Sequence, residues 1–401
     1  MTLSDKYEAG NVDGAKLSRR DWILLPLLCF LTICLLAGSI ELIAWRTFIR
    51  SGTSGEDCMV FDDPLIGARG IPHSVCQEKI PEGTLTEYRF NSDGYRNDAD
   101  LAPKSPGTYR IVMVGTSVAA GFRVPREKTF AALLPAELSR RTGHRIELYN
   151  ESLPWRSPHA IGVHFDEVLA AKPDMILWIL APLDIENASW AIANNDVAHL
   201  HSWAKVQYYV KAAFAAKSFT ASMAEIFSHT RSAMLLDEFL YESQSQYVKS
   251  SLMGADYNAA FLISERDAQW QRRLEKFAGD AADMESRARE AGIPFVAALV
   301  PDRTQAAMIS MMGEWPRGFD PYKLGHELRS IIESHGGIYI DLLPDFTAIS
   351  NPQLSYFPID GHPNAPGHAT ITRLLADGLG NGAIPALITP AQPDAGLNQS
   401  K

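Results

Sequence analysis

The chain has 401 residues, of which 46% are hydrophobic and 21% carry a charged side chain. This is the composition of a globular protein long enough for one large domain with attached segments. The formal net charge of −10 argues against a nucleic-acid-binding protein, because such proteins present a strongly basic face.

An apolar run near the N-terminus predicts a transmembrane helix. Trp22–Ile40 is uncharged, and including residues 42–45 places Glu41 near an interface. About 19 residues at ~1.5 Å each nearly cross a ~30 Å hydrocarbon core. We therefore expect residues 1–21 to form a cytoplasmic tail and residues 22–45 a membrane anchor. A cleaved signal peptide is the competing interpretation, although the run is longer than usual and no clear small-residue cleavage site follows it.

Residues 46–105 have the composition of a linker and lead-in, with turn-forming residues and a short strand pattern over residues 86–91. Cys58 and Cys76 lie 18 residues apart in this segment and are candidates for a disulfide if the segment is exported. Two free thiols are the alternative. The spacing fits no zinc-binding pattern.

From residue 106 to residue 380 the pattern alternates between strand and helix, with a helical insertion over about residues 187–265. The predicted strands are Ile111–Thr116, Arg145–Tyr149, Met175–Ala181, Pro294–Val300 and Ile338–Leu342. The predicted helices are Thr129–Arg141, Ser157–Ala171, Asp267–Ala291, Tyr322–His335 and Pro366–Leu379. This order predicts an α/β fold: a doubly wound, parallel, five-stranded sheet in a flavodoxin-like three-layer arrangement. We expect the insertion to form a cap beside the site and residues 381–401 to form a flexible tail.

Ser117 ends the first of these strands. It follows Gly115 and Thr116, and small residues lead from it to Gly121. Open α/β sheets place their chemistry at the C-terminal ends of their strands, so this serine is a candidate nucleophile. The competing interpretation is a strand-to-helix turn in which Ser117 caps the helix.

The candidate base lies late in the chain, in the stretch FPIDGHPNAPGH. Asp360 and His362 precede the last predicted helix. A carboxylate can hold one imidazole nitrogen while the other accepts a serine proton. The loop after the fifth strand comes near the end of the first strand in a doubly wound sheet, so we expect Ser117 and His362 to meet. An ordinary surface turn is the alternative for an isolated D-x-H.

These two motifs together resemble the SGNH (GDSL-type) hydrolases and acyltransferases. GTSVAAG and DGHPNAPGH occur in the expected order, and the lead-in RFNSDGYRN is typical of membrane-anchored bacterial members. The resemblance covers roughly residues 85–380 outside the insertion. It implies that Ser117 is the nucleophile, His362 the general base and Asp360 its orienting acid. An acid two positions before the histidine resembles the subgroup that moves acetyl groups on exported polysaccharides.

The departures from the family fall in the oxyanion hole. The resemblance implies three donors: the N–H of Ser117, a glycine N–H after the second strand and an asparagine side chain after the third. Here Trp155 stands at the second glycine position of the former block, where its side chain would crowd a substrate or make φ unfavourable. Leu183 replaces the asparagine and has no donor, and Asn187 is the candidate substitute. Thr116 also stands where the family most often has aspartate.

The resemblance implies a membrane-anchored serine esterase or O-acyltransferase with its domain on the periplasmic side, acting on acyl, mainly acetyl, esters of a carbohydrate. A transferase would need an acyl donor, which a membrane partner could supply. A catalytically weak or inactive glycan-binding or scaffold protein of an envelope polysaccharide system is the alternative. We expect no metal and no cofactor, because the histidines are scattered and the Gly115 turn lacks the glycine spacing and lysine of a phosphate-binding loop.

Overall fold

A parallel five-stranded sheet forms the centre of the molecule. The computed structural model describes residues 20–47, 55–63, 67–80, 82–186, 230–253, 259–311, 313 and 315–388. The strands lie in the order β6-β5-β7-β8-β9, and every neighbouring pair is parallel. They are β5 (Thr108–Gly115), β6 (Arg145–Asn150), β7 (Met175–Leu180), β8 (Phe295–Leu299) and β9 (Ile338–Asp341). The predicted doubly wound α/β fold is therefore confirmed.

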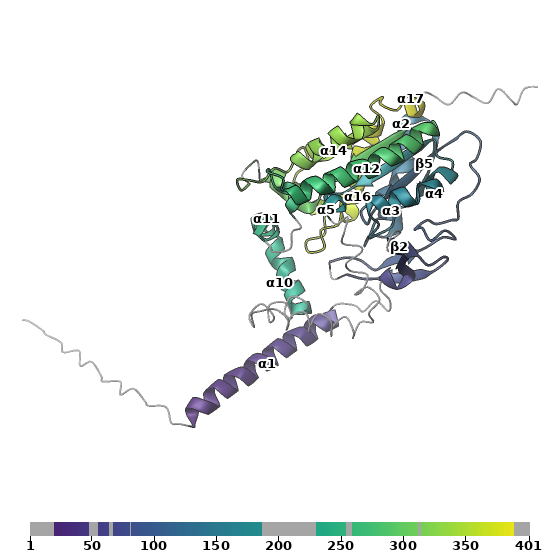
Figure 1. Cartoon of the computed structure of the whole chain (residues 1–401). Coiled ribbons are helices and arrows are strands. Elements are labelled where there is room, and N and C mark those ends of the chain that lie inside the picture. Colours follow the sequence, from purple (N-terminus) through teal and green to yellow (C-terminus); the bar gives the residue numbers. More distant parts are fainter. Residues whose placement is uncertain are drawn as a thin grey trace, which may run out of the picture.

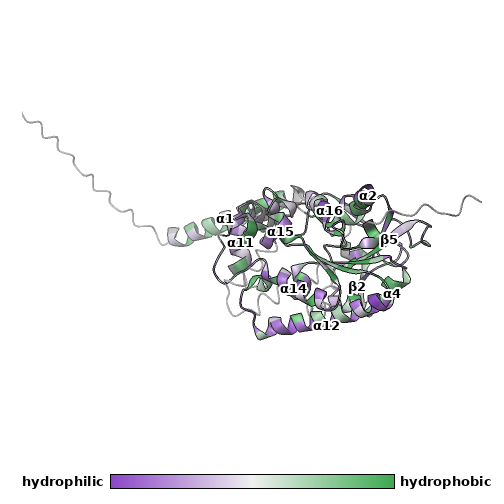
Figure 2. Ribbon diagram, turned by 90° about the horizontal axis from the view of Figure 1, so that it is seen from above, coloured by the Kyte–Doolittle hydropathy of each residue, from purple (hydrophilic) through white to green (hydrophobic). Residues whose placement is uncertain are grey.

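Helices cover both faces of the sheet, which explains why every residue of β5, β7 and β8 is buried. One face packs against α3 (Pro158–Val163), α4 (Phe165–Ala170), α12 (Ala268–Glu290) and α14 (Lys323–Ser334). The other packs against α2 (Phe130–Thr142), α13 (Arg303–Ser310), α15 (Leu343–Phe346), α16 (Ala365–Leu379) and α17 (Pro385–Ile388). Figure 2 shows the apolar strands between a layer with α12 and α14 and a layer with α2 and α16.

Side-chain caps account for several helix starts. Thr129, Asp267 and Asn364 accept a backbone N–H at the beginning of α2, α12 and α16. The helix predicted over residues 157–171 is instead two short helices. They meet at His164, whose φ of −94° and ψ of 10° depart from helical values.

The lead-in folds into two small antiparallel pairs. These are β1 (Met59–Asp63) with β2 (Gly67–Gly70), and β3 (Val75–Glu78) with β4 (Thr86–Arg89). Buried lead-in side chains such as Tyr88, Phe90 and Tyr95 belong to the same apolar cluster as the sheet. The segment expected to be a linker therefore packs on the domain. Its strands are short and are separated by turns, so in the sequence the segment resembles a loop.

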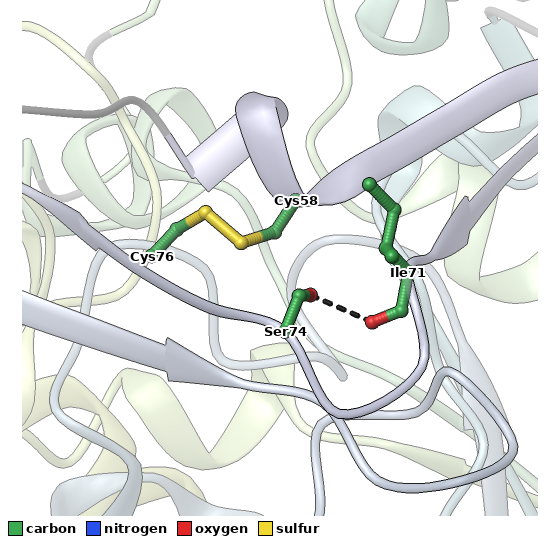
Figure 3. The surroundings of a disulfide bond; sticks show 4 residues. All are labelled: Cys58, Ile71, Ser74 and Cys76. Atoms are coloured by element: carbon green, nitrogen blue, oxygen red, sulfur yellow. Dashed lines mark hydrogen bonds between the residues drawn. A yellow bond between two sulfur atoms is a disulfide. The ribbon is translucent and has the colours of Figure 1, made fainter.

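A disulfide fixes this lead-in. Cys58 and Cys76 are bonded, with their Cα atoms 6.0 Å apart and both residues buried (Figure 3). Cys58 ends the 3-10 helix η1 (Gly55–Cys58), and Cys76 lies in β3. Nearby, the Ser74 hydroxyl donates to the Ile71 carbonyl at 2.6 Å, which closes the turn before β3.

The N-terminal helix α1 (Asp21–Thr47) extends away from the α/β body (Figure 1). Its segment Trp22–Ile43 is long and apolar enough to cross a membrane, a property that a signal sequence would share. Near its C-terminal end, the Glu41 carboxylate accepts hydrogen bonds from the backbone and hydroxyl of Ser232, at 3.0 and 2.9 Å.

Ser232 belongs to α10 (Arg231–Tyr241), which leads into α11 (Gln244–Met253) beside the body (Figure 1). Both helices lie within the predicted insertion, of which residues 187–229 and 254–258 lie outside the described residues. Short elements complete the fold. They are α5 (Pro182–Glu186) and the 3-10 helices η2 (Arg126–Lys128), η3 (Ala260–Leu262) and η4 (Pro352–Ser355).

Candidate active site

Ser117 lies at the C-terminal edge of the sheet, two residues beyond β5. A glycine is required at position 115, because a Cβ there would stand 2.6 Å from the Ile179 carbonyl oxygen and 2.7 Å from the Ala119 Cβ. This close approach to β7 brings the turn tightly over the sheet edge. The Ser117 side chain is half-buried and points into a cavity.

The structure brings together the three residues that the motifs single out. Ser117 Oγ lies 2.8 Å from His362 Nε2, and His362 Nδ1 lies 2.7 Å from Asp360 Oδ1. The sequence distance between the serine and the histidine is 245 residues. A hydroxyl held against an imidazole whose other nitrogen meets a carboxylate can lose its proton to the ring as it attacks a carbonyl carbon.

The loop carrying Asp360 and His362 is held from two sides. Within the loop, the Phe357 amide donates to the His362 carbonyl at 2.9 Å, and Gly361 adopts a positive φ of 77°. From the lead-in, the Glu82 carboxylate accepts the amides of Ile359 and Asp360 at 2.8 and 2.7 Å. The lead-in thereby fixes the backbone from which the acid projects.

Arg123 pairs with the carboxylate of Asp360, Nη1 to Oδ2, at 2.5 Å. Burial alone would raise the pKa of Asp360, but the facing His362 and Arg123 more than offset it and lower the pKa to about 2. Arg123 has a left-handed φ of 65°, which is uncommon for a residue with a side chain. The hydroxyl of Tyr88 accepts its amide at 2.7 Å, and its carbonyl accepts the Thr86 hydroxyl at 3.2 Å.

The serine and the histidine open into a cavity of about 380 Å³. Leu183 of α5 lines one part of its wall, and Tyr241 and Tyr247 from α10 and α11 line another. Arg303, the first residue of α13, also lines this cavity. Helices α10 and α11, which lie within the predicted insertion, therefore contribute part of the cavity wall.

Trp155, which stands where the sequence motif led us to expect a glycine, has a positive φ of 60°. Of the two effects expected from this replacement, the structure shows the unfavourable φ. The indole ring packs edge-on against Phe122 at 5.4 Å between ring centroids, and Phe122 in turn meets the His362 ring at 5.6 Å. The tryptophan thus packs behind the histidine, away from the described cavity wall.

The expected donors of the oxyanion hole are only partly visible. The Ser117 amide donates to no backbone carbonyl within the described part of the chain. Leu183 lines the cavity at 37% exposure and offers no donor. Asn187, the candidate substitute, lies outside the described residues.

Thr116 and Asp184 form a contact that the sequence motifs did not indicate. The Thr116 hydroxyl donates to Asp184 Oδ1 at 2.6 Å, and Asp184 Oδ2 accepts the amide of Ala181 at 2.8 Å. Burial raises the pKa of Asp184 to about 6 despite these bonds. The pair ties the turn after β5 to the start of α5.

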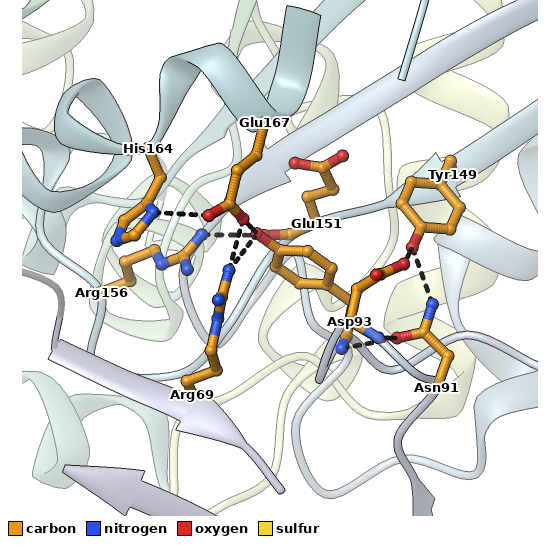
Figure 4. Close-up of polar contacts among 9 residues, drawn as sticks. Arg69, Asn91, Asp93, Tyr149, Glu151, Arg156, His164 and Glu167 are labelled. Atoms are coloured by element: carbon orange, nitrogen blue, oxygen red, sulfur yellow. Dashed lines mark hydrogen bonds and ion pairs between the residues drawn. The ribbon is translucent and has the colours of Figure 1, made fainter. Parts of the chain in front are cut away.

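A partly exposed polar network joins the lead-in to α4 (Figure 4). Glu167 accepts the Tyr95 hydroxyl at 3.0 Å, pairs with Arg69 and contacts His164 Nδ1 at 3.0 Å. Burial raises the pKa of Glu151, beside this network, to about 8. His164 is therefore part of this network through its contact with Glu167.

Comparisons with known proteins give matches only at the level of structure. The chain matches no protein-family model and no curated protein sequence. It is similar to the crystal structure of the lipase/acylhydrolase from Enterococcus faecalis (13% identity, TM-score 0.36, 71% of this chain and 100% of that chain). It is also similar to an acetyl xylan esterase, AlAXEase (13% identity, TM-score 0.36, 67% and 99%). A third is a structure described as a putative lipolytic protein of the G-D-S-L family from Desulfitobacterium hafniense DCB-2 (13% identity, TM-score 0.31, 67% and 98%).

Proposed function

We propose that the chain is a serine esterase or O-acyltransferase of the SGNH type. The observation that carries the proposal is the contact of Ser117 Oγ with His362 Nε2, with Asp360 on the other ring nitrogen. In the first step the Ser117 oxygen attacks the acyl carbon while its proton passes to His362. The alcohol leaves with that proton, and the acyl group remains on the serine.

The second half of the reaction decides between hydrolysis and transfer. Water or a carbohydrate hydroxyl gives its proton to His362 and attacks the acyl carbon. The bond from that carbon to Ser117 Oγ then breaks, and Oγ takes the proton back from the ring, which releases an acid or a new ester. The backbone N–H of Ser117 would stabilise the negative oxygen of each tetrahedral intermediate. The backbone N–H of Trp155 and the side-chain amide of Asn187 are the further candidate donors. The resemblance of the acid-histidine loop favours a short acyl group, such as acetyl, on a carbohydrate.

The proposed location is the outer face of the cytoplasmic membrane. The apolar segment Trp22–Ile43 would anchor the chain, and the disulfide between Cys58 and Cys76 fits a domain held in an oxidising compartment such as the periplasm. An acyl donor supplied through a membrane partner would make the protein a transferase.

The test compares Ser117→Ala and His362→Ala with the wild-type chain on 4-nitrophenyl acetate. Each variant should lose turnover by roughly 10⁴-fold or more, because the two groups act as one unit. Ser243→Ala and His159→Ala are matched controls, since Ser243 is exposed and His159 pairs with Asp280 away from the cavity. A fluorophosphonate probe should label Ser117 in the wild type.

The alternative is a binding or scaffold protein with a weak or inactive centre, and Leu183 is the observation that favours it. A wild-type chain that neither turns over acyl esters nor reacts with the probe, but still binds acetylated glycans, would establish the alternative. Equal turnover by Ser117→Ala and wild type would also reject the esterase proposal.

A further inference from the structure

Arg303 stands out among the side chains that line the cavity. It begins α13 directly after β8 and shares the cavity with Ser117 and His362. Its exposed fraction is only 4%. Among the described lining residues it is the one lysine or arginine.

The guanidinium group of Arg303 is incompletely bonded. Nη2 donates to the Tyr241 carbonyl at 2.5 Å, and the ring of Tyr247 lies 3.7 Å from the guanidinium carbon. Nε and Nη1 are buried and have no hydrogen-bond partner within the described part of the chain. By contrast, buried Arg96 donates to four backbone carbonyls.

No carboxylate of the described residues lies within ion-pair distance of Arg303. Burial lowers the pKa of its guanidinium group, although the more distant carboxylates of Asp302 and Glu82 act to raise that pKa. The neighbouring Asp302 instead caps α13, where its Oδ1 accepts the Gln305 amide at 2.7 Å. Burial raises the pKa of Asp302 to about 6. A buried cation with unused donors is costly unless an anion approaches it, and an unsatisfied group beside a site calls for a ligand, an ion or a water.

We propose that Arg303 binds an anionic group of the substrate, a carboxylate or a phosphate, in the cavity. The inference rests on the proposed function and names the substrate class, an acylated anionic carbohydrate. Arginine suits this role because its planar, permanently charged fork matches carboxylate and phosphate oxygens. Tyr241 and Tyr247 supply aromatic surface, and Ser250 and Ser251 supply hydroxyl groups, beside the same space.

Nε and Nη1 are buried, so side chains around the guanidinium group, among them the Tyr247 ring at 3.7 Å, must shift before a ligand can reach them. This ring belongs to α11, which is held to α13 by the hydrogen bond of the Ser310 hydroxyl to Gln244 Oε1 at 2.6 Å. Arg303 therefore also has a packing role, because it contacts Tyr241 of α10 and Tyr247 of α11. The experiment must separate this packing role from recognition of a charge.

The experiment measures kcat and KM of the full chain in detergent on three acetyl esters with one sugar ring. These are acetylated methyl glucoside, the corresponding glucuronoside and the corresponding glucoside 6-phosphate. Arg303→Met should raise KM for one or both anionic esters by roughly 10- to 100-fold, as expected for loss of a charged hydrogen bond. The KM for the neutral ester should change much less, so that the preference for the anionic esters over the neutral one falls by at least roughly tenfold.

Arg273→Met is the matched control, because Arg273 also lies over an aromatic ring, that of Trp270, but outside the cavity. It should leave all three esters unchanged. The carboxylate and phosphate arms identify which anion the site prefers. If Arg303→Met weakens all three esters equally, Arg303 is only a structural clamp and the proposal is rejected. A wild type without preference for either anionic ester rejects it as well.

A second measurement does not depend on turnover. Calorimetry with methyl glucuronoside and with inorganic phosphate compares the wild type with Arg303→Met. Binding that is lost in Arg303→Met supports the anion site even if no ester is turned over, which would reject only the proposed enzymatic function. Absence of binding to both probes, together with equal kinetics, overturns the anion site.

Discussion

Arg123 and His362 contact opposite oxygens of the same carboxylate, that of Asp360. Arg123 Nη1 lies 2.5 Å from Oδ2, and His362 Nδ1 lies 2.7 Å from Oδ1. The acid is therefore held by a fixed cation on one side while it orients the imidazole on the other. This makes Arg123 a positioning residue, which acts on the chemistry through Asp360.

Arg123→Gln should lower kcat on 4-nitrophenyl acetate by about tenfold or more with little change in KM, because a mispositioned acid weakens a step that follows binding. The low pKa of Asp360 also contributes stability that is present above the unfolded value near 4 and is lost as the pH falls toward about 2. Without Arg123 that pKa should rise, so acid unfolding should begin at a higher pH.

Arg126→Gln is the control for this change, because Arg126 pairs with the exposed Asp98. It should leave kcat and the acid-unfolding midpoint unchanged. An Arg123→Gln variant with wild-type kcat and an unchanged midpoint would show that Asp360 needs no second partner.

Leu183→Asn should increase the turnover of acyl esters if the missing oxyanion donor limits the rate. One donor is typically worth about 10²–10³ in rate, and a side chain on the short helix α5 would supply part of it, so we expect an increase of about tenfold. The measurement is kcat on 4-nitrophenyl acetate. Leu183→Asp introduces a side chain of the same shape as asparagine but without its N–H donor, and it should lower kcat. Equal effects of the two substitutions would contradict the assignment of position 183.

Glu151→Gln should change how stability depends on pH. Burial raises the pKa of Glu151 from its usual 4.5 to about 8, although Arg156 opposes the shift. Between these two values the folded state keeps a proton that the unfolded state has released. Through this group, the unfolding free energy therefore falls by about 1.4 kcal/mol for each unit by which the pH rises.

The glutamine variant removes that dependence, so its stability relative to the wild type should rise between pH 5 and pH 8 in urea unfolding. Glu275→Gln, on the exposed side of α12, is the control and should follow the wild type at every pH. A constant difference between Glu151→Gln and wild type over this range would show that Glu151 titrates normally.

Reduction of the disulfide between Cys58 and Cys76 should destabilise the domain by about 3 kcal/mol, the loop-closure value for a loop of this length. Denaturant unfolding with and without reductant gives the measurement, and a double Cys58→Ser, Cys76→Ser variant should match the reduced wild type. Cys29 and Cys34 are free thiols on α1, so their replacement by alanine should not change the effect of reductant. Equal stability of the oxidised and reduced protein would contradict a structural role.

The sequence carried enough information for the sheet, because five apolar strands alternate with amphipathic helices at ordinary spacings. It also indicated Ser117, Asp360 and His362 as partners, since each stands in a recognisable motif. Arg123 and Glu82 were not predictable in the same way. Both are single charged residues in turns, and only the tertiary fold brings them to the Asp360 loop.

The surroundings of Leu183 and Trp155 show a second limit. The motif comparison identified both as replacements, but it left open whether Trp155 enters the site or strains the backbone. The answer depends on Phe122, whose ring receives the indole and lies between it and His362. Such a packing choice depends on side chains from separate loops, which periodicity and spacing do not encode.

The hydrogen bonds of Glu82 to the Ile359 and Asp360 amides have a consequence for proteolysis. Residues 102–107, which join the lead-in to β5, are exposed, so a protease can cut there. The two fragments would remain associated through the buried side chains of the lead-in, since these belong to the core. A nicked protein would keep its acid in place only while the smaller fragment stays bound, and dissociation of that fragment would release the loop that holds His362.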